Sequence, residues 1–255
     1  MRMVYEMIRV NDLKNTTVVI EHYYENENKK HVGTAFILKV MTLEGIKYYL
    51  CSCAHVFEGD GLKTCFSIPA RNKKSNEYLP DYYIKTHNKA VANQEMDIAY
   101  IDITDKIIDI LSKYETPIRF IEISDIISNN ERQMLDDADD IFFVGYHGAF
   151  AYDLEKHPLI LKGNIATPIR QSYNNGFLSY IRTEGGISGA PVYVFFNDTY
   201  KILGTLIEAN IREHKVLDVN NKEKTIYEYI NLSQCTYTYN LLDLIQEEYV
   251  FIDVM

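Results

Sequence analysis

The chain has 255 residues, 47% of them hydrophobic, which is enough for one large domain or two small ones with a packed core. Its 36 acidic residues exceed its 26 lysines and arginines, and the formal net charge of −10 argues against nucleic acid or an anionic membrane as a partner. No apolar run is as long as a membrane span, and the start lacks the apolar core of a signal peptide, so we expect a cytoplasmic protein.

The four cysteines, at positions 51, 53, 65 and 235, form no Cys-x-x-Cys pair. We therefore expect reduced, mostly buried thiols and no zinc site. The acidic run at 136–140 could bind calcium, but carboxylate runs more often stay hydrated in a loop. We expect neither a metal nor an organic cofactor.

Short runs of β-branched and aromatic residues alternate with turn residues along the chain, which predicts an all-β protein of the sandwich or barrel type. In the first half we expect strands near 4–10, 16–24, 34–41, 47–52, 63–68, 82–86 and 98–103. In the second half we expect them near 119–123, 141–146, 159–165, 176–182, 191–196, 201–211 and 225–231.

Helical periodicity is confined to two segments. Apolar residues recur at helical spacing in 104–112, and the stretch from there to Pro117 is the predicted seam between two halves. A short amphipathic helix is expected over 239–245, with Asn240 as its cap.

The stretch 185–191, Gly-Gly-Ile-Ser-Gly-Ala-Pro, places Ser188 among three glycines and a proline, just before an apolar strand. Glycines permit positive φ and close approach of the backbone to a ligand. A serine on such a turn can present its hydroxyl outward and its own N–H toward a reacting carbonyl. The motif also fits a plain glycine-rich hairpin, so its interpretation depends on the rest of the chain.

Two further residues could complete a catalytic group with this serine. His55 follows an apolar strand and small Ala54, a position that suits a base that must be both fixed and reachable. Asp97 opens the apolar run 98–103, where a partly buried carboxylate needs a partner such as an imidazole N–H. A core histidine and a solvent-facing aspartate are the structural alternatives, and Asp102 is a weaker candidate for the carboxylate.

The order His, Asp, Ser, in the segments Gly-Thr-Ala-Phe-Ile-Leu, Cys-Ala-His-Val, Asp-Ile-Ala-Tyr-Ile and Gly-Gly-Ile-Ser-Gly-Ala-Pro-Val, resembles that of the trypsin-like (chymotrypsin-fold) serine peptidases, in particular their bacterial and viral branch. The resemblance spans roughly residues 30–210. It implies two antiparallel six-stranded β-barrels with a short C-terminal helix, residues 1–115 forming the first barrel and 116–255 the second.

The resemblance implies a role for each matched residue. Ser188 would be the nucleophile, His55 the general base, and Asp97 the residue that orients it, while the backbone N–H groups of Gly186 and Ser188 would form the oxyanion hole. Two features depart from the digestive members of the family. Ile187 replaces the acidic residue that pairs with a freed N-terminus, and Val56 replaces a cysteine beside the histidine. We therefore expect no activation by a new N-terminus.

Substrate contacts follow from the same resemblance. Arg182, six residues before Ser188, would lie at the floor of the pocket for the side chain before the cut, where a buried guanidinium would favour Asp or Glu. Pairing of Arg182 with an acid of the protein is the alternative. The backbone of Ile207, Glu208 and Ala209 would pair with an extended substrate.

The sequence thus predicts a serine endopeptidase that acts on a protein or peptide through an acyl-enzyme, with a regulatory protein as a second proposed partner. The first alternative is a catalytically silent peptide-binding module on the same fold. The second is an esterase that uses the same triad. In esterases the triad histidine usually comes last in the chain, and His214 is the only histidine after Ser188.

Overall fold

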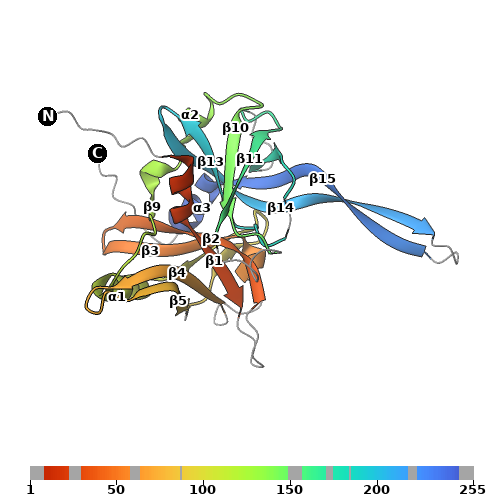
Figure 1. Cartoon of the computed structure of the whole chain (residues 1–255). Coiled ribbons are helices and arrows are strands. Elements are labelled where there is room, and N and C mark those ends of the chain that lie inside the picture. The colour runs from red at the N-terminus through yellow and green to blue at the C-terminus, as the bar shows by residue number, and fades with distance from the viewer. Residues whose placement is uncertain are drawn as a thin grey trace.

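The computed structural model describes residues 9–22, 30–57, 64–86, 88–148, 157–170, 175–183, 185–217 and 223–246. The chain is mainly β, with one open antiparallel sheet, one closed six-stranded barrel and a C-terminal helix (Figure 1). The predicted strand at 4–10 lies largely outside the described residues. From Val10 the chain forms a 3-10 helix, η1 (Val10–Thr16), instead.

The first sheet contains the strands of the N-terminal half in the order β5-β4-β1-β2-β3-β7-β6. Short β8 pairs with β4, and short β9 runs parallel to β2. The strands are β1 (Thr17–His22), β2 (Lys30–Thr42), β3 (Gly45–Ser52), β4 (Thr64–Asn72), β5 (Tyr78–Lys85), β6 (Val91–Asn93), β7 (Ile98–Asp102), β8 (Tyr114–Glu115) and β9 (Ile121–Glu122).

This sheet is open where a closed six-stranded barrel was predicted, because the described parts of β5 and β6 at its two ends do not pair with each other. Ile84 is the one buried residue of β5, which also carries Pro80 and Asp81, and β6 is only three residues long. Short, polar and proline-bearing strands are typical of sheet edges, since they resist further pairing.

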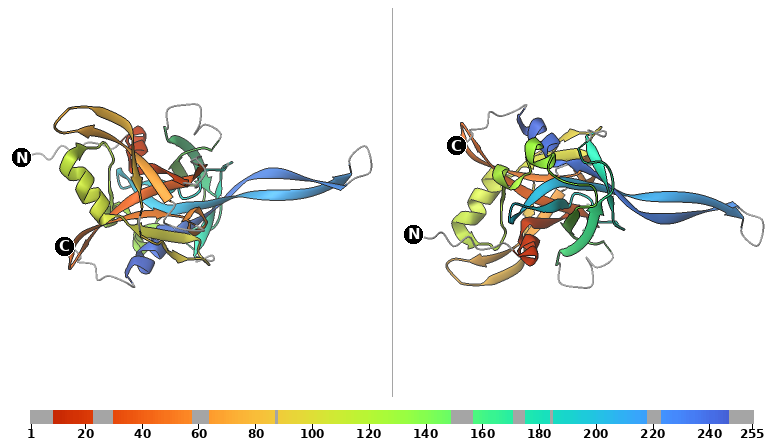
Figure 2. Two further views of the ribbon diagram at one scale, coloured as in Figure 1. Left: turned by 90° about the horizontal axis from the view of Figure 1, so that it is seen from below. Right: turned by 90° about the horizontal axis from the view of Figure 1, so that it is seen from above.

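The second sheet closes into a barrel with the order β10-β11-β12-β15-β14-β13, as predicted for that half. Its strands are β10 (Asp140–Gly145), β11 (Leu159–Ile165), β12 (Gly176–Tyr180), β13 (Pro191–Phe196), β14 (Thr199–Leu217) and β15 (Glu223–Tyr237). The last two strands are far longer than predicted. They continue past the barrel as a two-stranded ribbon that projects from the body (Figures 1 and 2).

The helices are few and short: η2 (Ala54–Phe57), α1 (Thr104–Lys113), η4 (Ile123–Asp125), α2 (Asn129–Arg132) and α3 (Thr238–Gln246). The two predicted helices are confirmed as α1 and α3. Asn240 does not cap α3, however. It lies inside the helix, buried, and its side-chain amide donates to the carbonyl of Asn175 over 2.7 Å. A cap and a helix-to-loop anchor look alike in sequence, because both place Asn near a helix start.

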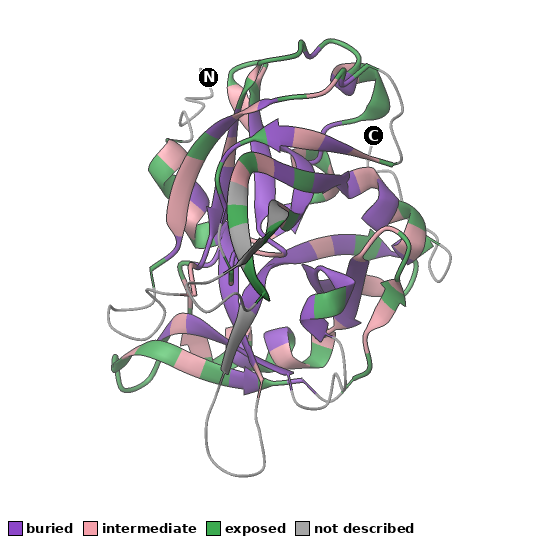
Figure 3. Cartoon of the chain, turned by 90° about the vertical axis from the view of Figure 1, so that its right-hand side faces the viewer, coloured by how far each residue is buried: buried purple, intermediate pink, exposed green. Residues whose placement is uncertain are grey.

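Three apolar clusters hold the molecule together. One cluster packs against the open sheet, one lies inside the barrel, and the third lies between the two sheets. The third joins Phe36 and Tyr49 of the first sheet to Tyr193 and Ile202 of the barrel, and α3 adds Leu241. Figure 3 shows that the buried residues are concentrated on the strands in the interior of the molecule. Burial of this interface fixes the sheets relative to each other.

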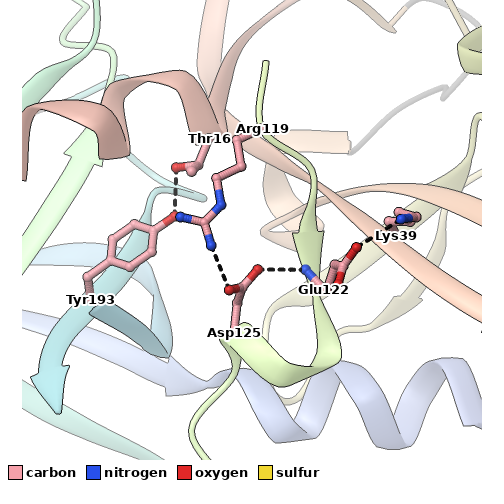
Figure 4. A network of polar contacts seen from close by, with 6 residues as sticks. All are labelled: Thr16, Lys39, Arg119, Glu122, Asp125 and Tyr193. Carbon is pink, nitrogen blue, oxygen red and sulfur yellow. Dashed lines mark hydrogen bonds and ion pairs between the residues drawn. The ribbon is translucent and has the colours of Figure 1, made fainter. Parts of the chain in front are cut away.

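Polar contacts reinforce this interface (Figure 4). The hydroxyl of Tyr193 on β13 donates to Thr16 Oγ1 at the end of η1 over 2.6 Å. On the segment between the sheets, Arg119 pairs with Asp125, whose other oxygen accepts the backbone N–H of Glu122. The connection between the halves is therefore held to the body. The domain boundary at 115/116 stays a prediction, and β9, just after it, pairs with the first sheet.

None of the helices in the described parts of the chain is both long and apolar enough to span a membrane.

Candidate active site

His55 lies on η2, the single turn that follows β3. Ser52 ends the strand, and the turn closes with the N–H of Val56 donating to the carbonyl of Cys53 over 3.2 Å. A ring nitrogen of His22, at the end of β1, contacts the carbonyl of Val56 at 2.9 Å. The backbone of the turn is thus held on both sides, while the His55 side chain stays 39% exposed.

Asp97 lies in the turn between β6 and β7, at a φ of +50°. Asn93 and Ile98 pair across the hairpin, and Asn93 Oδ1 accepts the N–H of Met96 over 3.1 Å. Asp and Asn tolerate the left-handed region better than most residues do, because their short polar side chains bond locally. The turn therefore favours Asp at this position and directs its carboxylate toward η2.

The Asp97 carboxylate bonds to His55 at two points. Oδ2 lies 2.6 Å from the ring atom Nδ1, and Oδ1 accepts the backbone N–H of His55 over 2.9 Å. One oxygen thus satisfies a helix-start N–H, and the other sets the orientation of the ring. With Nδ1 held by the carboxylate, Nε2 lies on the opposite edge of the imidazole. The competing acid, Asp102, instead accepts the backbone N–H of Thr104 at the start of α1.

Ser188 occupies a tight turn before β13. The N–H of Ala190 donates to the carbonyl of Ile187 over 3.0 Å, and Gly189 has a φ of +85°. A positive φ at the third position is typical of a type II turn, with Ser188 in the second position. Gly186, at a φ of +93°, adds a second bend that residues with a side chain rarely adopt. Ser188 itself is half-buried.

Thr34 on β2 joins this turn to the first sheet. Its N–H donates to the carbonyl of Ser188 over 2.8 Å, and its hydroxyl donates to the carbonyl of Gly186 over 3.2 Å. The same hydroxyl accepts the N–H of Tyr146, and the carbonyl of Thr34 accepts the hydroxyl of Ser52. The side chain is fully buried. One residue therefore links two sheets and the glycine-rich turn.

The turn also lies against the segment that carries His55. A Cβ built on Gly33 would be 2.8 Å from the side chain of Val56 and 3.0 Å from the carbonyl oxygen of Ser188. The residue after His55 and the backbone of Ser188 therefore meet at the same glycine. The structure thus brings His55 and Asp97 into direct contact and places Ser188 beside the turn that carries the histidine.

Cys53 fills the space between these parts. Its thiol donates to the carbonyl of Leu206, which also accepts the N–H of Gly189. Burial raises the pKa of Cys53 well above its ordinary value, and the Asp97 carboxylate raises it further. A protonated, fully buried thiol is a poor nucleophile. The other three cysteines are also buried and form no disulfide, as predicted.

Cys53, His55 and Asp97 place one potential metal-ligand atom each within 4.8 Å of one another. The thiol is protonated, however, and the imidazole and carboxylate are already hydrogen-bonded to each other at 2.6 Å. A metal ion would have to replace all of these bonds. The acidic run at 136–140 serves the backbone and nearby cations instead: Asp137 accepts the N–H of Ile169, and Asp140 pairs with Lys162.

Of the predicted substrate residues, Ile207, Glu208 and Ala209 lie on β14, and Arg182 lies between β12 and the Ser188 turn. Ile207 is buried and Glu208 exposed, at a bulge that shifts the register of β14 between Leu206 and Glu208; a second shift follows Ala209. Arg182 is exposed, so the expected buried guanidinium at the floor of a pocket is absent. The neighbouring Thr183 is buried instead. Alternation along an extended segment turns adjacent side chains to opposite sides, and a spacing rule alone does not predict which one faces inward.

Comparison of the chain with protein-family models finds no match, and comparison with curated proteins finds no similar sequence.

Sequence reasoning missed the residues that support the site. Thr34 stood in the quoted Gly-Thr-Ala-Phe-Ile-Leu segment, and Ser52 directly before the cysteine of Cys-Ala-His-Val, but neither carried a signal of its own. His22 lies one strand earlier. Their roles depend on contacts between residues far apart in the chain, such as Thr34 with Gly186, which local patterns do not encode.

The Thr34 hydroxyl gives a direct test of how the turn is held. Thr34→Val keeps the shape of the side chain but removes the hydroxyl that donates to the carbonyl of Gly186 and accepts the N–H of Tyr146. We expect the free energy of unfolding to fall by about 2–3 kcal/mol, measured by urea denaturation.

Thr64→Val is the matched control, because Thr64 is equally buried and its hydroxyl has no hydrogen-bond partner among the residues that the structure describes. This substitution is expected to be neutral or stabilising, since it removes an unpaired polar group. Equal losses in the two variants would contradict the role of Thr34.

A second pair of variants tests the conformation of the turn. A Cβ on Gly189 would lie 2.0 Å from Ser52 Oγ and 2.1 Å from the carbonyl oxygen of Thr34, in a backbone with positive φ. Gly189→Ala should therefore cost more than about 3 kcal/mol of stability. Gly185→Ala, four residues earlier and with open space around its Cβ, should stay within about 1 kcal/mol of the parent. A stable Gly189→Ala protein would show that the turn is not fixed against Ser52.

Proposed function

We propose that the protein is a serine endopeptidase of the trypsin-like kind, working through Ser188, His55 and Asp97. The observation that carries this proposal is the two-point bond between Asp97 and His55, at 2.6 and 2.9 Å, beside a glycine-rich turn that contains Ser188. The closed barrel and the second antiparallel sheet are compatible with a chymotrypsin-type fold without being specific to it. A two-barrel relationship to that family is part of the proposal.

The proposed chemistry follows from the bond at Nδ1. A carboxylate there holds the Nδ1–H tautomer, which leaves Nε2 as the nitrogen that accepts the proton of Ser188. Ser188 Oγ then attacks the peptide carbonyl, and the tetrahedral intermediate collapses to an acyl-enzyme as the imidazolium protonates the leaving amine. Water attacks the ester by the same steps, returning the proton to Ser188. Asp97 stabilises the imidazolium without taking its proton.

The oxyanion of the intermediate needs N–H donors that are already in place. The N–H groups of Gly186 and Ser188 are proposed for this role. The turn that contains them is held at its carbonyls by Thr34, so it pays little reorganisation during the reaction. A preorganised donor of this kind is worth about 3–4 kcal/mol of barrier lowering.

The proposed substrate is a protein or peptide bound in extended form along Ile207–Ala209. An acidic preference before the cut would rest on Arg182, which is an exposed residue, and exposed charges are screened by solvent and contribute little discrimination. A partner protein that controls activity and a cytoplasmic location remain proposals from the sequence. The alternative function is that of a catalytically silent peptide-binding module, which would bind a peptide along Ile207–Ala209 without cleaving it.

A fluorophosphonate probe tests the proposal, because it reacts only with a serine activated by a correctly placed base. We expect the folded protein to be labelled at Ser188 and to cleave an unfolded protein such as β-casein. Ser188→Ala should abolish labelling and cleavage, while the free energy of unfolding stays within about 1 kcal/mol of that of the parent protein.

Ser112→Ala, at an exposed serine of α1, is the control and should be labelled normally. Absence of labelling and cleavage in the folded parent protein would contradict the proposal and favour the binding module.

A further inference from the structure

The proposed function assigns no role to the ribbon that β14 and β15 form beyond the barrel. We call Ile211–Leu217 and Glu223–Tyr229 the arm. The two strands pair continuously from Ile211 with Tyr229 to Leu217 with Glu223, and the arm extends away from both sheets (Figure 2). Among the described side chains of the arm, His214 pairs with Glu228 and Lys215 with Glu223, all four of them exposed. Exposed ion pairs of this kind contribute little stability.

One edge of β14 leads from Ser188 onto the arm. On this edge β14 pairs with β13 as far as Thr205 opposite Pro191. The next residue, Leu206, exchanges both of its backbone hydrogen bonds with Gly189 and Ala190, the two residues after Ser188. From Ile207 outward, β14 pairs only with β15 within the described residues. The open edge therefore begins where the serine turn ends.

The open edge is much longer than a contact of three residues requires. At ~3.3 Å per residue, the stretch from Ile207 to Leu217 covers on the order of 30 Å. A two-stranded ribbon is marginally stable alone in water, whereas a third strand satisfies its free backbone groups. The two register shifts in β14, next to Ile207 and Asn210, are bulges of the kind that re-aim an edge beside an active site.

We infer that the β14 edge of the arm, beyond Ala209, binds the part of an extended substrate polypeptide that precedes the cut, as an added antiparallel strand. The inference rests on the proposed peptidase function. It makes the substrate class a long, unfolded or flexible segment rather than a short peptide, with affinity coming from backbone hydrogen bonds and not from side-chain pockets.

Strand direction supports this occupant. β13 runs antiparallel to β14 on the same edge and starts just after the Ser188 turn. A strand added farther out, in line with β13 and with the same direction, runs from the arm toward the body. Its carboxyl end therefore arrives at Ser188, and the residues before the cut lie on the arm. The outer edge of β15 offers no such continuity, since β12 pairs with β15 there at Gly176–Ser179.

An arm-shortened variant tests the inference. Residues 212–228 are replaced by Asn-Gly, which joins Ile211 to its partner Tyr229 through a two-residue turn. Fluorophosphonate labelling of Ser188 should be unchanged, whereas KM for β-casein should rise about tenfold or more. An unchanged KM with normal labelling would overturn the inference and leave the peptidase proposal intact.

Binding without turnover separates the two proposals. In the Ser188→Ala background, β-casein should bind the full-length chain more tightly than the arm-shortened chain. Equal binding overturns the inference. Arm-dependent binding by a protein that neither cleaves nor labels supports the edge and refutes the peptidase. A dimer that dissociates when the arm is shortened, seen by sedimentation, would assign the edge to a second copy and overturn the inference.

Modified substrates give a test that needs no change to the protein. Two peptides are made around a bond that is cut in β-casein, each with eight residues before it. In one of them, alternate backbone amides beyond the third residue before the cut are N-methylated, which removes hydrogen-bond donors and keeps the side chains. The methylated peptide should show the higher KM, and equal values would contradict an added strand.

Discussion

The bonding of Thr34 is the interaction on which the rest of the site depends. Its N–H, carbonyl and hydroxyl reach Ser188, Ser52, Gly186 and Tyr146, so one buried residue joins the open sheet, the barrel and the glycine-rich turn. The apolar cluster between the sheets brings these groups together, but apolar contact is not directional. Hydrogen bonds to Thr34 give the serine turn one position relative to the first sheet, and a catalytic group requires that accuracy.

The contact between His55 and Asp97 determines the orientation of the proposed base. A carboxylate in a left-handed turn position bonds both the backbone and the ring of the same histidine, so the base and its helix are oriented by a single residue. Buried Cys53 lies beside this pair and donates its thiol hydrogen to the carbonyl of Leu206. Because its thiol is held protonated by burial, it leaves the neighbouring carboxylate to the histidine. The catalytic chemistry we propose for Ser188 rests on this arrangement.

The parts of the fold that depend on local pattern were predictable. Strands such as 159–165 and 191–196 match their observed limits because apolar residues and turn residues mark both ends. Other features were not predictable: the length of β14, the failure of the first sheet to close between β5 and β6, and the exposure of Arg182. Each depends on how neighbouring segments pack and pair, and not on the local pattern. Within the site, residue order predicted the contact of His55 with Asp97. Thr34 could not be found this way, since its partners lie more than a hundred residues away in the chain, at Tyr146 and Gly186.

The claim that Asp97 activates Ser188 through His55 is tested most directly by the rate of serine phosphonylation in Asp97→Asn. Asparagine tolerates the same left-handed backbone and keeps an oxygen for the N–H of His55, but its amide favours the wrong imidazole tautomer. The second-order rate constant for labelling should fall by about 10³–10⁴-fold in Asp97→Asn, with the fold retained. A labelling rate equal to that of the parent protein would contradict it.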